Sequence, residues 1–307
     1  MKKNTWLILG IISGVLGLLA GTVICIFALL PGTAHNVPVI PTGAPNALKK
    51  QSDHWVELSD KRYYLHEDCK IVTGWMPIDG KQHYFDPDGA MHTGWLELDG
   101  ERYYLKEDGA MAIGQLTIDG IPRFFTASGK STLLVNHTFP IPDDYPYNLV
   151  NFGNFQIDQA VVEPLTEMLA AAKAAGHSCS IGYAYRSITF QQSIWDRNVA
   201  TNMRAGYDYE TACKITATTV MTPGHSEHQT GLAIDFNTPI SGSFQWLQEN
   251  CWKYGFILRY PNGKTHKTGI AYEPWHYRYV GKELAKELHE SGLCMEEYIE
   301  MLTQTQS

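Results

Sequence analysis

A period of 20 residues runs through the chain between about residues 55 and 130. Three features return at this spacing: Gly74-Trp75 and Gly94-Trp95; Asp79-Gly80, Asp99-Gly100 and Asp119-Gly120; Tyr84, Tyr104 and Phe124. An Asp-Gly pair between two short apolar runs is typical of a β-hairpin turn. Because one hairpin cannot bury its own aromatic rings, such units are expected to stack. The period therefore predicts a solenoid of β-hairpins over residues 52–131.

These units resemble the cell-wall-binding repeats of Gram-positive surface proteins, of the choline-binding and glucan-binding type. The resemblance implies that the repeats bind a cell-wall polymer. In the choline-binding pattern, a Trp two residues after the turn glycine helps to cage a quaternary ammonium group. Here Arg62, Gln82 and Arg102 hold that position, so Trp75, Trp95 and the tyrosines are left for a partial cage. A spacer role for the repeats is the alternative.

The N-terminal segment from residue 6 to residue 30 contains no charged side chain. As a helix it would be roughly 37 Å long at about 1.5 Å per residue, which covers a hydrocarbon core of about 30 Å. The apolar region of a secretory signal is only about 7–15 residues long, so an uncleaved membrane anchor is favoured. Lys2 and Lys3 precede the segment, which predicts a cytoplasmic N-terminus and extracytoplasmic domains at a Gram-positive-type cell surface. Residues 31–51, rich in Pro, Gly and Ala, are expected to be a linker.

Charge and cysteine content exclude two further classes. The net charge of −8 argues against a nucleic-acid partner, because phosphate binding needs a basic surface. No CxxC pair occurs among the six cysteines, which argues against a structural zinc knuckle. Four cysteines in the C-terminal part can form up to two disulfides outside the cytoplasm or remain buried thiols: Cys179, Cys213, Cys251 and Cys294.

The repeat ends near Leu133, and residues 132–307 are predicted to form a separate domain. Residue patterns predict helices over 157–176, 189–200, 244–254 and 281–290, and strands over 180–185, 232–236, 256–260 and 276–280. These helices and strands do not alternate regularly. The expected fold class is therefore α+β rather than a doubly wound parallel sheet.

Two short segments of this domain combine the residues of a catalytic metal site. Residues 226–235 provide His228 and Asp235, and residues 273–276 provide Glu273 and His276. Two imidazoles and one carboxylate, with an open fourth position, are typical of catalytic zinc. Glu273 is left over, and it is suited to take a proton from a water molecule that the metal activates. The sequence therefore predicts a zinc hydrolase.

Four segments of the domain resemble the M15 zinc peptidases, in particular the D-alanyl-D-alanine carboxypeptidases of the VanY type. They are 185–191 (YRSITFQ), 223–235 (PGHSEHQTGLAID), 254–261 (YGFILRYP) and 272–281 (YEPWHYRYVG). The resemblance implies a hedgehog-like α+β domain that binds one zinc ion and acts on peptidoglycan stem peptides. It assigns the metal to His228, Asp235 and His276, and the catalytic base to Glu273.

The same resemblance assigns residues to the substrate pocket. Arg186 matches a catalytic position, where it can hold an oxyanion or the terminal carboxylate. The expected substrate-binding residues are Gln191, Ser226, Tyr260 and Trp275. The leading hypothesis is a membrane-anchored D,D-carboxypeptidase that removes the C-terminal D-Ala from stem peptides. The alternatives are an L,D-carboxypeptidase acting on tetrapeptides, a non-catalytic wall-binding protein, and an endopeptidase with an open cleft.

The expected topology can be tested on intact cells. Protease added to protoplasts should remove the C-terminal domain, because residues 6–30 would place it outside the membrane. Immunoblotting of the C-terminus measures the loss, and a cytoplasmic protein that stays intact is the control. Full protection of the C-terminal domain would contradict an anchor of this orientation.

Overall fold

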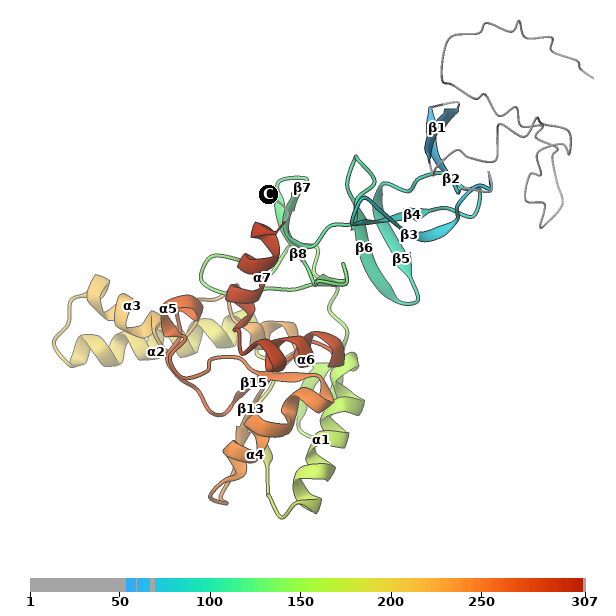
Figure 1. Ribbon diagram of the computed structural model, residues 1–307. Helices are drawn as coiled ribbons and strands as arrows, with labels where there is room; N and C mark the ends of the chain where they lie inside the picture. Colours follow the sequence, from blue (N-terminus) through green and yellow to red (C-terminus); the bar gives the residue numbers. More distant parts are fainter. Residues whose placement is uncertain (1–53, 59, 67–69, 306–307) are drawn as a thin grey trace, which may run out of the picture. The chain divides into compact units, whose positions relative to one another are not determined.

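The computed structural model describes residues 54–305, except residue 59 and residues 67–69 (Figure 1). The predicted anchor at residues 6–30 and the linker at residues 31–51 lie outside the described residues. None of the helices within the described ranges is both long enough and apolar enough to cross a membrane. By its contacts the described chain divides into two compact units, one of residues 54–76 and 85–91 and the other of residues 77–84 and 92–305.

The predicted β-hairpins are present at the predicted spacing. Their strands are β1 (His54–Leu58), β2 (Lys61–Leu65), β3 (Gly74–Ile78), β4 (Lys81–Phe85), β5 (Gly94–Leu98), β6 (Glu101–Leu105), β7 (Gly114–Ile118) and β8 (Ile121–Phe125), and β9 (Ser131–Thr132) adds to the last hairpin. At each turn an aspartate has a positive φ, between 50° and 62°. Tight hairpin turns require this backbone conformation, which explains the Asp-Gly period.

In the first and third hairpins an aromatic ring packs beside the tryptophan, and an arginine covers one face of it. In the first hairpin the Trp55 ring lies 5.1 Å from Tyr64, with the Arg62 guanidinium 4.4 Å from its centroid. In the third hairpin Trp95 lies 5.3 Å from Tyr104, with Arg102 also at 4.4 Å. These are cation–π distances. The arginines that replace a cage tryptophan therefore place their own positive charge on the remaining tryptophan.

The C-terminal part is a mixed fold built on an antiparallel sheet, as the α+β prediction requires. The strand order is β12 (Ser180–Tyr183), β13 (Ala233–Asn237), β15 (His276–Tyr279) and β14 (Phe256–Leu258). A separate hairpin pairs β10 (Leu149–Phe152) with β11 (Phe155–Asp158). The helices are α1 (Val162–Ala174), α2 (Ile188–Arg204), α3 (Tyr209–Ala217), α4 (Ser243–Asn250), α5 (Thr265–Thr268), α6 (Lys282–Ser291) and α7 (Met295–Gln304).

Three details differ from the sequence prediction. The helix predicted from residue 157 begins instead at Val162, because residues 155–158 pair with β10 and Asp158 caps a short 3-10 turn through the Ala160 amide. The helix predicted to end the domain, α6, is followed by α7, and α3 was also not predicted. Cys179, Cys213, Cys251 and Cys294 are free thiols.

The sheet has one apolar face and one polar face. Ile234 and Phe236 of β13 and Tyr277 of β15 are almost fully buried in the same core cluster as Leu165 and Met168 of α1. Side chains alternate between the two faces of a strand. Asp235, between Ile234 and Phe236, and His276, next to Tyr277, are therefore directed to the opposite face, where the site lies.

A second apolar cluster joins the last hairpin to the C-terminal helices. Its buried members are Phe124, Leu134, Leu284, Leu288, Met295, Tyr298, Ile299 and Leu302. Figure 1 shows α7 beside β7 and β8, and the Gln115 amide donates a hydrogen bond to Oγ1 of Thr303 at 2.9 Å. Hairpin β7–β8, which precedes the predicted domain boundary, therefore shares a core with helices α6 and α7, which follow it. The boundary between residues 131 and 132 stays a prediction.

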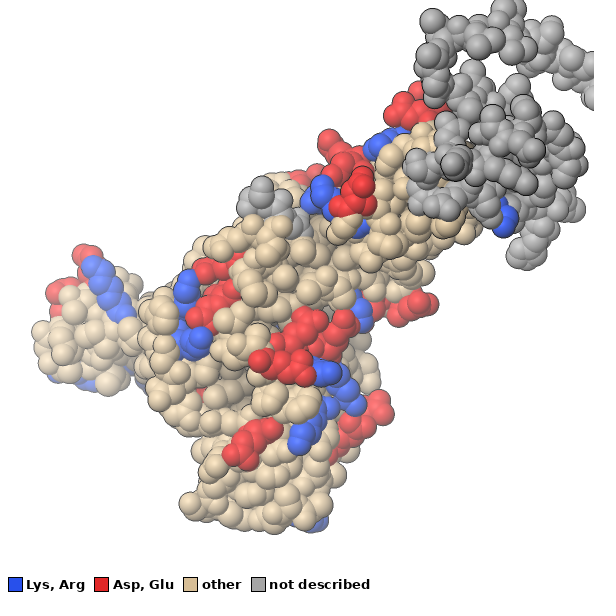
Figure 2. Space-filling model, viewed as in Figure 1, with Lys and Arg blue, Asp and Glu red and all other residues tan. Residues whose placement is uncertain are grey.

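Surface charges of both signs are mixed on the visible face of the described residues. Figure 2 shows Lys and Arg side chains interspersed with Asp and Glu. Exposed ion pairs within the described residues include Lys267 with Glu300 and Lys214 with Glu210. Pairs of this kind contribute little to stability.

The shared cluster gives a stability prediction for the last hairpin. Phe124 is 4% exposed and packs edge-on against Phe139 at 4.9 Å, so Phe124→Ala should destabilise the C-terminal domain by about 3–5 kcal/mol. The matched control is Tyr104→Ala, one repeat earlier, where the ring packs on Trp95 and Phe125. Chemical denaturation followed by the fluorescence of the C-terminal domain measures both. If both substitutions lower the free energy of unfolding of the C-terminal domain equally, the last hairpin does not share a core with the C-terminal helices.

Candidate metal centre and active site

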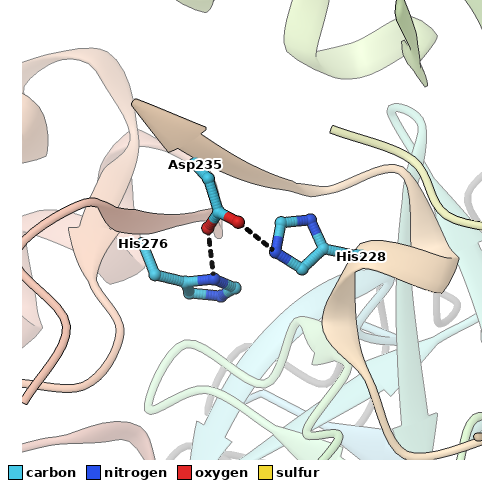
Figure 3. Close-up of side chains that lie close together, drawn as sticks. All are labelled: His228, Asp235 and His276. Atoms are coloured by element: carbon cyan, nitrogen blue, oxygen red, sulfur yellow. Dashed lines mark hydrogen bonds and ion pairs between the residues drawn. The ribbon is translucent and has the colours of Figure 1, made fainter. Parts of the chain in front are cut away.

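The three predicted ligands lie together at the polar face of the sheet (Figure 3). Asp235 on β13 pairs directly with His276 on β15 in the strand register. His228 comes from a short 3-10 helix (Glu227–Thr230) immediately before β13. One donor atom from each of the three residues lies within 4.8 Å of the others. Residues 48 positions apart in sequence are thus brought together mainly by one strand pairing.

A glycine allows the turn that presents His228. Gly231 ends the 3-10 helix at φ 80°, a backbone conformation that favours glycine. A Cβ atom there would lie 2.6 Å from Cδ2 of Leu149 and 2.8 Å from the backbone nitrogen of Asp158. No larger residue fits this turn, because β10 and β11 pack directly against it.

The rings are oriented so that one nitrogen of each faces Asp235. Nδ1 of His228 donates to the backbone carbonyl of Ala184 at 2.7 Å, and its Nε2 lies 3.1 Å from Oδ2 of Asp235. Nδ1 of His276 lies 2.9 Å from Oδ1 of Asp235. Nε2 of His228 is buried and lacks a hydrogen-bond partner within the described residues. A lone pair held in this way beside a carboxylate fits a metal ligand, and the backbone carbonyl fixes the ring tautomer.

The charges around the rings favour a cation between them. Burial alone would raise the pKa of Asp235, but the two imidazoles hold that pKa well below its usual range, so Asp235 is a carboxylate. Burial lowers the pKa of His228 to about 4, so this ring is neutral, as a metal ligand must be. Burial would also lower the pKa of His276, but Asp235 and Glu227 outweigh it and raise this pKa to about 9. The carboxylates thus favour a positive charge at His276, and a metal ion bound there would take the place of the extra ring proton.

Glu273 lies beside the cluster without joining it. Its Oε2 is 3.9 Å from Nδ1 of His276, and its side chain is 14% exposed. Burial, reinforced by the charge of Asp235, raises the pKa of Glu273 to about 7, against the opposing effects of His276 and Arg186. A carboxyl group with a pKa near neutrality is suited to accept and return a proton.

Arg186 is tied to the cluster by an ion pair. Its Nη2 donates to Oδ2 of Asp235 at 2.6 Å. The guanidinium also lies 4.8 Å from the centre of the Tyr183 ring. Its Nε is buried and has no hydrogen-bond partner in the described part of the chain. Arg186 therefore combines a structural pairing with a donor that a bound anion can use.

A cleft of about 770 Å³ contains all the predicted site residues. Tyr260 is buried, with its ring 4.9 Å from His276, and Ser226 is buried at the start of the 3-10 helix. Gln191 is buried on α2 and donates to the backbone carbonyl of Met221 at 2.7 Å. Trp275 is 41% exposed. The structure thus brings the nine residues together, whereas their individual roles stay predictions.

Sequence reasoning missed two residues of this region. Tyr183 lines the cleft and stacks against Arg186, and Glu227 lies behind His276 with 1% of its surface exposed. Glu227 stands directly before the ligand His228, and a charged residue inside a buried motif was a signal that could have been followed. Tyr183 gave no such signal, since it lies in an ordinary strand pattern.

Comparisons with known proteins identify the family. Residues 154–282 match the model of the VanY family, described as D-alanyl-D-alanine carboxypeptidase, and residues 72–116 match the choline-binding repeat. A solved structure of a vancomycin-resistance D,D-pentapeptidase VanY mutant in complex with Zn(II) is 41% identical, and the match covers 54% of this chain and 97% of that chain with a TM-score of 0.52. The chain belongs to the VanY family. The resemblance of the sequence to the VanY carboxypeptidases and to the choline-binding repeats is therefore confirmed.

Two further relatives support the VanY assignment. A D-alanyl-D-alanine carboxypeptidase of Enterococcus faecalis is 42% identical over 175 residues, which is 55% of this chain and 65% of the relative. VanYB in complex with D-alanine-D-alanine is 41% identical, covers 55% of this chain and 96% of that one, and has a TM-score of 0.53. This chain spans just under two thirds of the length of the curated E. faecalis relative.

The cluster geometry gives a prediction for metal binding. His228→Ala and His276→Ala should each remove most of the bound zinc, because each change removes one of three protein ligands. His289→Ala is the matched control, since that ring stacks on Trp252 and belongs neither to the ligand group nor to the lining of the cleft. Zinc per chain is measured by elemental analysis after gel filtration. A full zinc equivalent in either ligand variant would remove that residue from the metal site.

Proposed function

We propose that this protein is a zinc-dependent D,D-carboxypeptidase that removes the C-terminal D-Ala from peptidoglycan stem peptides. The observation that carries the proposal is the group of His228, Asp235 and His276, with the unused carboxyl group of Glu273 beside it in one cleft. The solved relatives contain Zn(II) in one case and D-alanine-D-alanine in another. The donor set of this chain fits the same metal.

The chemistry divides between the metal and the side chains. Zinc, when bound by His228, Asp235 and His276, would polarise the scissile carbonyl and acidify a water molecule. Glu273 accepts the proton of the attacking water at its carboxylate and returns it to the leaving amine. Its raised pKa suits both directions of transfer.

Arg186 and two polar side chains make the site suitable for an exopeptidase. The guanidinium keeps its charge and can bind an oxyanion or a carboxylate. Ser226 and Gln191 lie in the same cleft, where they can bind the terminal carboxylate of the peptide. A carboxylate receptor next to the metal favours removal of a terminal residue over endopeptidase cleavage. The terminal methyl group would lie against Trp275 and Tyr260.

The other parts of the chain support a location at the cell wall. The repeats, which match the choline-binding family model, would hold the enzyme to a wall polymer. Residues 6–30, outside the described residues, would anchor it in the membrane with the catalytic domain outside. A hedgehog-like architecture of that domain, implied by the family resemblance, belongs to the same proposal. Together these parts would keep the cleft close to its substrate.

A single substitution separates metal binding from catalysis. Glu273→Ala should keep its zinc and lose at least about 10²- to 10⁴-fold in rate, because general-base catalysis contributes that much. Glu249→Ala, an exposed carboxylate on α4, is the control. D-Ala release from a pentapeptide and zinc content are measured on one sample. Near wild-type turnover of Glu273→Ala would exclude it as the base, and loss of zinc would place Glu273 among the ligands.

The wild-type protein in the same assay tests the substrate. Pentapeptide and tetrapeptide stems are offered separately, and released D-Ala is measured. We expect release from the pentapeptide. Release from the tetrapeptide alone would favour the L,D-carboxypeptidase, and no release from either by the zinc-loaded protein would favour a non-catalytic wall-binding protein.

A further inference from the structure

Four charged side chains lie buried together behind the metal cluster. They are Glu227 before His228, Arg259 after β14, Arg278 on β15 and Glu296 on α7, and none is more than 7% exposed. Two negative and two positive charges balance. Ions are buried at a large desolvation cost unless each is paired and hydrogen-bonded. Because burying these charges is costly, their position next to the predicted ligand His276 indicates a function.

The inner end of the group faces His276. Oε1 of Glu227 accepts a hydrogen bond from Nε of Arg259 at 2.9 Å and lies 2.9 Å from Nη1 of Arg278. Oε2 of Glu227 lies 3.7 Å from Nε2 of His276. Both of these last two atoms are buried and have no hydrogen-bond partner within the described ranges. One carboxylate oxygen is thus held by arginines, while the other faces the imidazole.

The two nitrogens of His276 have different surroundings. Nδ1 faces Asp235 at 2.9 Å, on the side where the three ligands meet. A metal bound at Nδ1 leaves the ring proton on Nε2, because a neutral imidazole has one N–H. The carboxylate of Glu227 is the acceptor that faces this proton. Partners of this kind fix the tautomer and the orientation of a ligating histidine.

The outer end of the group reaches the C-terminal helix. Arg259 donates to both oxygens of Glu296 on α7, from Nη1 at 3.0 Å and from Nη2 at 2.6 Å. Asn136 donates to the same carboxylate at 3.0 Å. A guanidinium held by two parallel hydrogen bonds has a fixed plane. The position of Arg259, and hence of Glu227, is therefore set by α7.

We infer that Glu227 is a positioning residue of the metal site and that α7 supports it through Arg259 and Glu296. The inference rests on the proposed zinc site of His228, Asp235 and His276. Glu227 touches neither metal nor substrate; it holds His276 with Nδ1 toward the ligand cluster. The C-terminal helix is then part of the metal site, although it contributes no ligand.

Zinc affinity of the full chain in detergent tests the role of Glu227. Glu227→Gln should weaken zinc binding about 10- to 100-fold in a chelator competition, as loss of such a partner does elsewhere. Melting temperatures of the zinc-free and zinc-loaded forms are measured on the same sample. The rise in melting temperature that zinc produces should shrink in the variant. A purely structural role would lower both melting temperatures equally and leave the affinity unchanged, which would overturn the inference.

A second pair of variants tests the support from α7 and decides the matter if Glu227→Gln does not fold. Glu296→Gln removes the remote charge without touching His276 and should weaken zinc binding several-fold. Glu300→Gln makes the same chemical change on the exposed side of α7, where the residue pairs with Lys267, and should leave the affinity unchanged. If Glu296→Gln binds zinc as tightly as the wild type, α7 does not support the site. If Glu227→Gln also does not fold, that result overturns the whole inference.

The outcome is separable from that of the proposed function. Failure of the wild-type chain to bind zinc would refute the metal site and this inference together. Failure to release D-Ala, with zinc affinities that change as expected, would refute the proposed activity and leave the positioning role of Glu227 intact.

Discussion

The site depends on the pairing of Asp235 with His276 across two neighbouring strands. This register sends both side chains to one face of the sheet, while Ile234, Phe236 and Tyr277 enter the core on the other. The same backbone pairing that buries the apolar face therefore sets the distance between two ligands. A slip of either strand by one residue would turn the predicted ligand of that strand toward the core. Packing and metal geometry are for this reason specified by the same contacts.

The charges around His228, Asp235 and His276 favour binding of a cation. Asp235 lies between two imidazoles, and Glu227 and Glu273 lie on either side of His276. Burial deprives these groups of water, so their charges must be balanced within the protein. Arg259 and Arg278 balance Glu227, whereas burial, reinforced by the charge of Asp235, raises the pKa of Glu273 to about 7. In the proposed mechanism Glu273 is then the carboxyl group that transfers protons, and Glu227 is the one that supports His276.

The last hairpin of the repeats, β7–β8, shares an apolar cluster with the C-terminal helices. The last repeat has Gln115 where earlier repeats have tryptophan, and it packs on α7 instead of completing an aromatic cluster of its own. In the first and third hairpins, Arg62 and Arg102 lie on their tryptophans. A quaternary ammonium ligand would have to compete with these guanidinium groups for the ring faces. The aromatic content of these two hairpins therefore does not by itself make a quaternary-ammonium site.

The sequence by itself determined the features that depend on local pattern: the hairpin period, from the turn requirement of Asp-Gly, and the candidate metal ligands, from unusual residue types in two short motifs. The helix at residues 295–304, the start of α1 and the charged partners of Glu227 were decided only by tertiary structure. Asn136 and Glu296 meet across 160 residues of sequence, and a buried charge reveals its partner only when both are in place. Local pattern sets which side chains are available; the packing of distant segments sets which of them meet and which charges are balanced.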